Sequence, residues 1–188
     1  MNKIHLLAFT ICLSSTTAMA TDNATGGNIS FSGAISDTTC MINGGNSTDF
    51  TVALSPISVA DAGTVVGPIT KNKNSFSLTF SDCSSAQGAS GSPLKLYFSS
   101  ANNISADGKY LLNNSVNESD VAVAKNVGFS LAEPGSSTPI PLNTPYQTTI
   151  IGDTMETVTF DVYYYKTNTS AAKVGELNSN VTYTISYL

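Results

Sequence analysis

The sequence has 188 residues, with thirteen acidic side chains, eight lysines, one histidine, no arginine and no tryptophan. The histidine is His5, in a segment that we expect to be removed, so Ser-His-Asp catalysis, Cys-His catalysis and the usual zinc sites are excluded. An acidic chain without arginine has no bidentate clamp for phosphate and is a poor partner for nucleic acid. We therefore expect no enzyme, no cofactor, no metal, no nucleic-acid partner and no small-molecule substrate.

Residues 1–20 have the pattern of a secretory signal peptide. Lys3 provides the positive start, a short apolar stretch covers residues 4–13, and Ala18-Met19-Ala20 forms a small-x-small cleavage site. The apolar stretch is too short for a membrane span. Cleavage after Ala20 would leave 168 residues with seven lysines against thirteen carboxylates, a formal charge of −6. That length predicts one domain with its own core.

Two cysteines remain after removal of the leader, Cys40 and Cys83. In an oxidising compartment they predict a disulfide that closes a loop of about 44 residues and contributes roughly 4 kcal/mol in the chain-entropy model. The alternative is a reactive thiol or a metal pair. It is disfavoured because no partner ligands are available.

The rest of the chain predicts an all-β domain. Short runs with alternating apolar and polar residues are separated by turn signals, a pattern typical of a β-sandwich. A helical period is absent, although a brief helical turn is considered for residues 59–63 or 120–124. The expected strands are residues 50–54, 76–80, 94–98, 127–131, 158–165 and 181–187.

Isolated charged residues are interpreted as structural. The sequences Asp61-Ala62-Gly63 and Asp107-Gly108-Lys109 are expected to be turns, not ion sites. Lys71 and Lys73 are expected on a solvated loop. Asp153 and Glu156 are too isolated to indicate a calcium site.

The two ends of the chain after the leader have strand-like patterns of different kinds. Residues 26–35 place glycine or apolar residues at odd positions, which by periodicity alone favours an ordinary first strand in the domain's own sheet. Residues 177–188 contain no charge and no proline, the groups that usually protect an edge strand. A loose amphipathic strand and an unprotected edge in one chain suggest that they are complementary between molecules.

The order and spacing of several motifs resemble the structural subunits of chaperone–usher fimbriae, specifically the type 1 fimbrial major pilin family of Gram-negative bacteria. The resemblance spans the whole chain after the leader. The motifs are Gly-Gly-x-Ile-x-Phe-x-Gly-x-Ile (residues 26–35) before Cys40, Asp82-Cys83, Asn126-Val127-Gly128-Phe129, Ile140-Pro141-Leu142, the strand from Phe160 to Tyr165, and the penultimate aromatic Tyr187.

The resemblance implies an incomplete immunoglobulin-like β-sandwich that lacks its last strand, with an N-terminal donor-strand extension. The extension would be residues 21–33 and the pilin domain residues 34–188. In such families a periplasmic chaperone fills the resulting groove with a strand of its own. At the outer-membrane usher, the N-terminal arm of the next subunit then replaces that strand.

The resemblance also implies roles for individual residues. Gly27, Ile29 and Phe31 are the donor-strand positions, and Gly27 corresponds to a glycine that fits a shallow pocket. The acceptor groove and chaperone-binding strand would be formed by Val181, Tyr183, Ile185, Tyr187 and Leu188, with the Leu188 carboxylate placed like the chain end that basic chaperone residues anchor.

The sequence thus predicts a structural subunit of a fimbria on the bacterial cell surface, exported through the periplasm and contributing to adhesion. Neighbouring pilin subunits, a chaperone and an usher would be its partners. The alternatives are a minor adaptor subunit and a sugar-binding adhesin. For the adhesin, Tyr163, Tyr164 and Tyr165 suggest a stacking platform, and strand alternation would bury Tyr164 and expose the other two.

Overall fold

The structure is a computed structural model that describes residues 39–45, 49–84, 93–100, 102–114, 121–151 and 155–186. All of them belong to the compact unit from Ile35 to Leu188. The predicted leader and donor-strand extension lie outside the described residues. In chain order the elements are β1 (Thr39–Ile42), a 3-10 turn (Asn43–Gly45), α1 (Val59–Ala62), β2 (Gly67–Ser84), β3 (Lys95–Ser99), β4 (Val127–Ala132), β5 (Tyr146–Gln147), β6 (Glu156–Lys166) and β7 (Thr182–Ser186).

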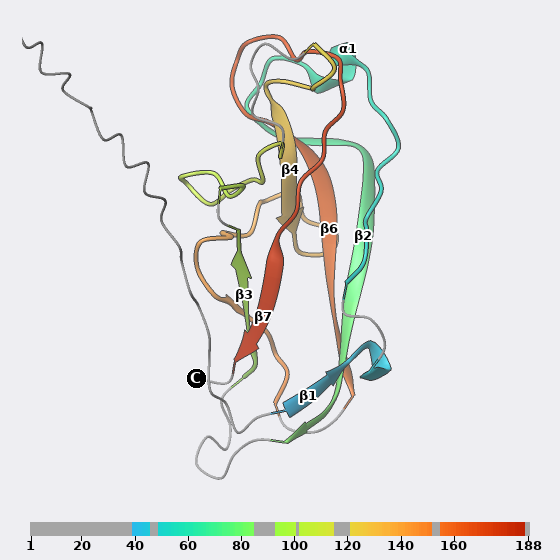
Figure 1. The fold of residues 1–188 in the computed structure, drawn as a ribbon, viewed down its shortest axis with the longest axis vertical. Coiled ribbons are helices and arrows are strands. Elements are labelled where there is room, and N and C mark those ends of the chain that lie inside the picture. The colour runs from blue at the N-terminus through green and yellow to red at the C-terminus, as the bar shows by residue number, and fades with distance from the viewer. Residues whose placement is uncertain are drawn as a thin grey trace, which may run out of the picture. The chain divides into compact units, whose positions relative to one another are not determined.

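The strands form two antiparallel sheets, which confirms the all-β prediction. One sheet has the order β1-β2-β6-β4 and the other β5-β3-β7 (Figure 1). The helical turn α1 lies at one of the two predicted places. A capping box stabilises its first turn, because the Ser58 hydroxyl accepts from the Asp61 N–H while the Asp61 carboxylate accepts from the Ser58 N–H.

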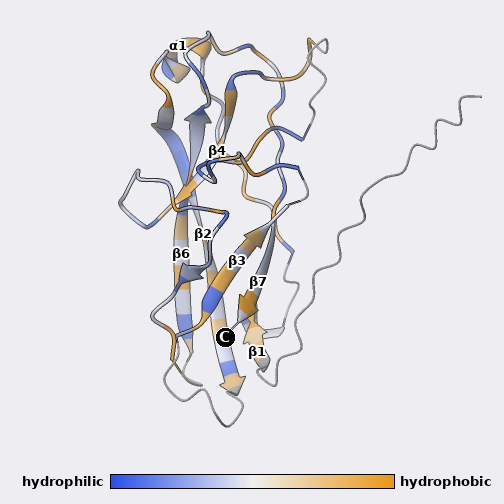
Figure 2. Cartoon of the chain, turned by 90° about the vertical axis from the view of Figure 1, so that its left-hand side faces the viewer, coloured by the Kyte–Doolittle hydropathy of each residue, from blue (hydrophilic) through white to orange (hydrophobic). Residues whose placement is uncertain are grey.

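The core lies between the two sheets. Leu78, Phe80 and Phe160 from one sheet are fully buried against Leu96 and Phe98 from the other. The Phe160 and Phe98 ring centroids lie 5.8 Å apart in an edge-to-face arrangement. Figure 2 shows hydrophobic residues along much of β3. Each large apolar side chain buried in this way stabilises the fold by about 2–3 kcal/mol.

The predicted disulfide is confirmed. Cys40 in β1 is bonded to Cys83 near the end of β2, 43 positions later in the chain. The same two strands pair through Met41 opposite Ser81 and Ile42 opposite Phe80. The disulfide therefore fixes the first described strand to the longest one.

β2 is longer than predicted and contains an irregularity. Its register against β6 shifts between Ile69 and Asn74, so that three extra residues are accommodated in β2. Lys71 and Lys73 were predicted on a solvated loop; both are exposed as expected, but the loop assignment was wrong, because they lie in this bulged part of β2. Each lysine makes an ion pair, Lys71 with Asp61 at 2.7 Å and Lys73 with Asp161 at 2.5 Å.

The burial predicted for the tyrosine run was also wrong. Tyr163 and Tyr165 are buried, with 4% and 5% of their surfaces exposed, whereas Tyr164 is half-buried. Loops cover the outer face of β6. The Tyr163 hydroxyl donates to the Ser136 carbonyl at 2.8 Å, and the Tyr165 ring stacks on Tyr110 with centroids 4.7 Å apart. Alternation along a strand distinguishes its two faces, and in β6 the core covers one face while loops cover the other.

Candidate functional site: an apolar groove beside β7

A groove of about 560 Å³ opens beside β7, at the edge of the three-stranded sheet. One of its walls is formed by residues 177–183, which lead into β7, and the other by residues 49–54. Its floor is formed by apolar side chains of both sheets and one connecting loop: Phe76, Phe98, Leu111, Phe129, Leu131 and Val162. The groove is therefore an opening into the core between two segments far apart in sequence.

The β7 wall presents alternate side chains to the inside. Val181, Tyr183 and Ile185 are half-buried and pack against the core, whereas Thr182 and Thr184 are exposed. Val181 and Tyr183 line the groove itself. In the part of the chain that the structure describes, β7 pairs with β3 alone. Its other side faces the groove.

The second wall is an extended segment that belongs to neither sheet. Residues 49–54 were predicted to include a strand, but the structure contains no ladder there. The predicted alternation is nevertheless real, because Val52 and Leu54 are half-buried against the core while Thr51 and Ala53 are exposed. This wall was not assigned to the groove from sequence, although its alternation was the available signal.

The floor includes a close approach of two backbones. Leu111 and Phe129 exchange backbone hydrogen bonds of 2.6 and 3.0 Å. A side chain at Gly128 would place its Cβ 2.3 Å from the Leu111 carbonyl oxygen. Glycine at position 128 is therefore required to seat these two groove residues side by side.

The groove is lined by few titratable side chains. Asp49 is the one carboxylate among its described lining residues. Burial, with the negative charge of Asp49 nearby, raises the pKa of Tyr183 above the usual tyrosine value. Elsewhere among the described residues, His, Cys, Asp and Glu side chains do not gather in threes that would hold a metal ion. No helix in the described ranges has the length and apolar character needed to cross a membrane.

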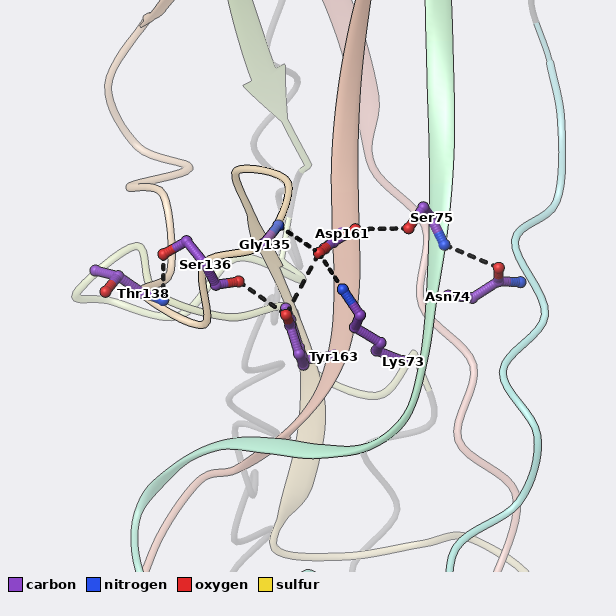
Figure 3. Close-up of polar contacts among 8 residues, drawn as sticks. All are labelled: Lys73, Asn74, Ser75, Gly135, Ser136, Thr138, Asp161 and Tyr163. Carbon is purple, nitrogen blue, oxygen red and sulfur yellow. Dashed lines mark hydrogen bonds and ion pairs between the residues drawn. The ribbon is translucent and has the colours of Figure 1, made fainter.

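A cluster of hydrogen-bonded polar side chains lies on the face of β6 that points away from the core and the groove (Figure 3). Asp161 lies between Phe160 and Val162 in the strand and so points away from the core. Its carboxylate, 3% exposed, accepts from Lys73 Nζ and Ser75 Oγ at 2.5 Å each and from the Gly135 N–H at 3.0 Å. Lys73 above all, together with Ser75 and Gly135, lowers the pKa of Asp161 to about 2.

The remaining predicted site residues are not placed by the structure. Gly27, Ile29 and Phe31 of the donor strand lie outside the described residues, as do Tyr187 and Leu188. The structure thus brings together Val181 and Tyr183 of the predicted acceptor strand with the wall and floor described above.

Fold and groove together define an immunoglobulin-like β-sandwich with an apolar opening at the edge of one sheet. The sequence profile of the fimbrial protein family matches residues 29–188. The chain belongs to this family and is a fimbrial subunit, a structural protein of the surface pilus and not an enzyme. A comparison with curated proteins gives no significant match.

Solved structures from pili share the fold. A subunit of a chaperone–usher pilus superposes with a TM-score of 0.60 at 14% identity, covering 87% of this chain and 96% of the other. The P pilus rod subunit PapA gives 0.58 at 12%, covering 79% and 99%. An antigen and type I fimbria protein of Burkholderia pseudomallei gives 0.52 at 16%, covering 81% and 96%. At these identities the likeness establishes the fold.

Proposed function

We propose that this fimbrial subunit polymerises by donor-strand exchange, with residues 21–33 of one subunit completing the sandwich of the next. The inserted side chains would be Gly27, Ile29 and Phe31. The observation that carries the proposal is the apolar groove between the edge strand β7 and the wall at residues 49–54, which belongs to neither sheet. A strand laid there would have backbone on both sides and the core beneath it.

The polar atoms of the groove support an occupant with a backbone. Ser179 is one of the residues that line the groove, and its buried hydroxyl makes no hydrogen bond within the described ranges. Buried hydroxyls normally have a partner. A carbonyl oxygen of an inserted strand would accept from it. The groove lining otherwise favours apolar side chains such as those of Ile29 and Phe31.

The energetics favour a strong joint. Burial of Ile29 and Phe31 would contribute on the order of 2–3 kcal/mol for each side chain, before any backbone hydrogen bond is counted. An inserted strand that binds only the folded state of the acceptor subunit also increases the stability of that folded state. Each contact between neighbouring subunits would therefore complete a β-sandwich as well as form an interface.

The same groove suggests the route of assembly. A periplasmic chaperone would fill it first, and the outer-membrane usher would be the place where the next subunit takes over. The similarity to a chaperone–usher pilus subunit and to a pilus rod subunit supports the role of a major subunit. The adhesin alternative loses its stacking platform, because Tyr163 and Tyr165 are buried.

A melting experiment tests the proposal. The full chain after leader removal is heated alone and with a peptide that copies residues 21–34. We expect a large upward shift of the melting temperature with this peptide and none with a peptide carrying Phe31→Asp. Equal melting temperatures in all three samples would contradict the proposal.

A further inference from the structure

The wall of the groove formed by residues 49–54 continues to residue 58 as extended chain outside both sheets. Side chains, not a backbone ladder, hold this segment beside β2. Asn74 Nδ2 donates to the Ala53 carbonyl at 2.8 Å. Asn72 Nδ2 donates to the Pro56 carbonyl at 2.7 Å and to the Ser55 carbonyl at 3.3 Å.

The bulge in β2 brings these two amides to the wall. It lies between Ile69 and Asn74, and Asn72 within it has a φ of 56°. Asparagine tolerates this left-handed conformation better than most residues. The flanking lysines fix the bulge on both sides, because Lys71 pairs with Asp61 beyond the wall and Lys73 with Asp161 of β6.

The opposite end of the wall is held differently. Phe50 packs on Phe76 of the floor, with ring centroids 5.2 Å apart, and is itself 45% exposed. Apolar contacts of this kind are not directional. The amide hydrogen bonds at residues 53–56 are directional, and so they define where the wall backbone lies.

We propose that Asn72 and Asn74 are positioning residues that set the wall at the distance required for strand insertion; this inference rests on the proposed function. Neighbouring strands lie about 4.7–4.9 Å apart, so a strand bonded to both the wall and β7 needs about twice that separation between them. Hydrogen bonds weaken when the donor and acceptor move a few tenths of an ångström from 2.7–3.2 Å. Because the wall has no ladder, the two amides hold it at 2.7 and 2.8 Å, and the Tyr164 hydroxyl adds a longer bond to the Ser55 carbonyl at 3.4 Å.

The test measures binding of the peptide copying residues 21–34 to the full chain after leader removal, by calorimetry. Asn74→Ala and Asn72→Gly each remove one amide, and glycine preserves the positive φ at position 72. We expect binding about fivefold weaker for each and on the order of 30-fold weaker for the double variant. Asn74→Asp, which keeps the shape but replaces the donor with an acceptor facing Ala53, should be at least as weak as Asn74→Ala.

Asn126→Gly is the matched control. Asn126 also has a positive φ, 64°, and its amide donates at 2.7 Å to the carbonyl of Ala171, a residue that does not line the groove. This variant should lose stability as Asn72→Gly does, yet bind the peptide like the wild type. That split between melting temperature and affinity distinguishes positioning of the groove from general stabilisation.

Two outcomes have different meanings. If the wild type binds the peptide and folded Asn74 variants bind it equally well, the positioning role is overturned. If the wild type itself does not bind the peptide, the proposed function fails and the positioning role fails with it. The Asn74 variants keep the test decisive should Asn72→Gly not fold.

Discussion

The ring centroids of Phe50 and Tyr183 lie 6.4 Å apart, so the two walls of the groove meet through their aromatic side chains. Phe50 belongs to the wall without a ladder and Tyr183 to β7. The contact narrows the groove at the Tyr183 end. An inserted strand would have to lie between the backbones that carry these two rings.

Strand insertion is therefore expected to separate Phe50 from Tyr183. Proton NMR of the full chain after leader removal should show cross-peaks between the two rings that weaken as the peptide copying residues 21–34 is added. The Tyr110–Tyr165 pair, with centroids 4.7 Å apart and neither residue in the groove, is the control and should be unaffected. Unchanged Phe50–Tyr183 cross-peaks at peptide saturation would contradict insertion at this place.

The donor arm is expected to be necessary for polymerisation and unnecessary for folding. A chain lacking residues 21–32 should remain monomeric but accept the arm peptide. Phe31→Asp should likewise block joining, because a charged side chain cannot enter an apolar groove without a large desolvation cost. Ser30→Asp, at the opposite parity of the strand, should still polymerise. Electron microscopy of assembled fibres checks this, and fibres of normal length from the Phe31→Asp chain would refute it.

The stability of the domain is expected to fall in acid because of Asp161. Its pKa is lowered to about 2 in the folded state from an ordinary 3.8, so its contribution is present above about pH 4 and is lost as the pH falls toward 2. Asp161→Asn should reduce the free energy of unfolding by about 1–2 kcal/mol at pH 7, a value discounted for the partly exposed Lys73.

Urea unfolding at pH 7 and at pH 2.5 measures this effect. The difference in stability between the two pH values should be smaller in Asp161→Asn than in the wild type. Asp107→Asn is the comparison: the Ser105 hydroxyl and Lys109 also lower the pKa of Asp107, but this side chain is 49% exposed, so its effect should be smaller than that of Asp161. An Asp161→Asn chain with the full acid sensitivity of the wild type would contradict the role assigned to this carboxylate.

The disulfide is expected to contribute substantially to stability. Replacing Cys40 and Cys83 by serine should lower the free energy of unfolding by roughly 4 kcal/mol, since the bond closes a loop of 43 positions. Denaturant titration checks this value. A reducing agent should destabilise the wild type to a similar degree and leave the double variant unchanged. Equal stabilities of the oxidised wild type and the double variant would be the opposite result.

Several elements followed from local sequence patterns. Alternation predicted the strands at residues 94–98 and 127–131 to within one residue at each end, and the serine and aspartate around residues 58–61 encode the short helix α1. The disulfide between Cys40 and Cys83 followed from counting the cysteines left after the leader. These features depend on neighbouring residues or on composition, which a sequence displays directly.

Other features depended on what covers a strand. Tyr163 and Tyr165 were expected at the surface, but the Ser136 carbonyl and the Tyr110 ring cover them. Lys73 is exposed as expected, but its bond to a carboxylate 88 positions away was not predicted. Periodicity distinguishes the two faces of a strand without showing that a loop will pack on the second one.

The sequence by itself determined that this protein is built of β-strands and carries a disulfide, because period and count are local or additive properties. Only the tertiary structure decided that residues 49–54 and 177–183 face each other across an apolar groove, and that two asparagines hold one of its walls. The reason is physical: a groove exists only where separate segments of the chain are held at a distance, and that distance is set by packing and hydrogen bonds between residues remote in sequence.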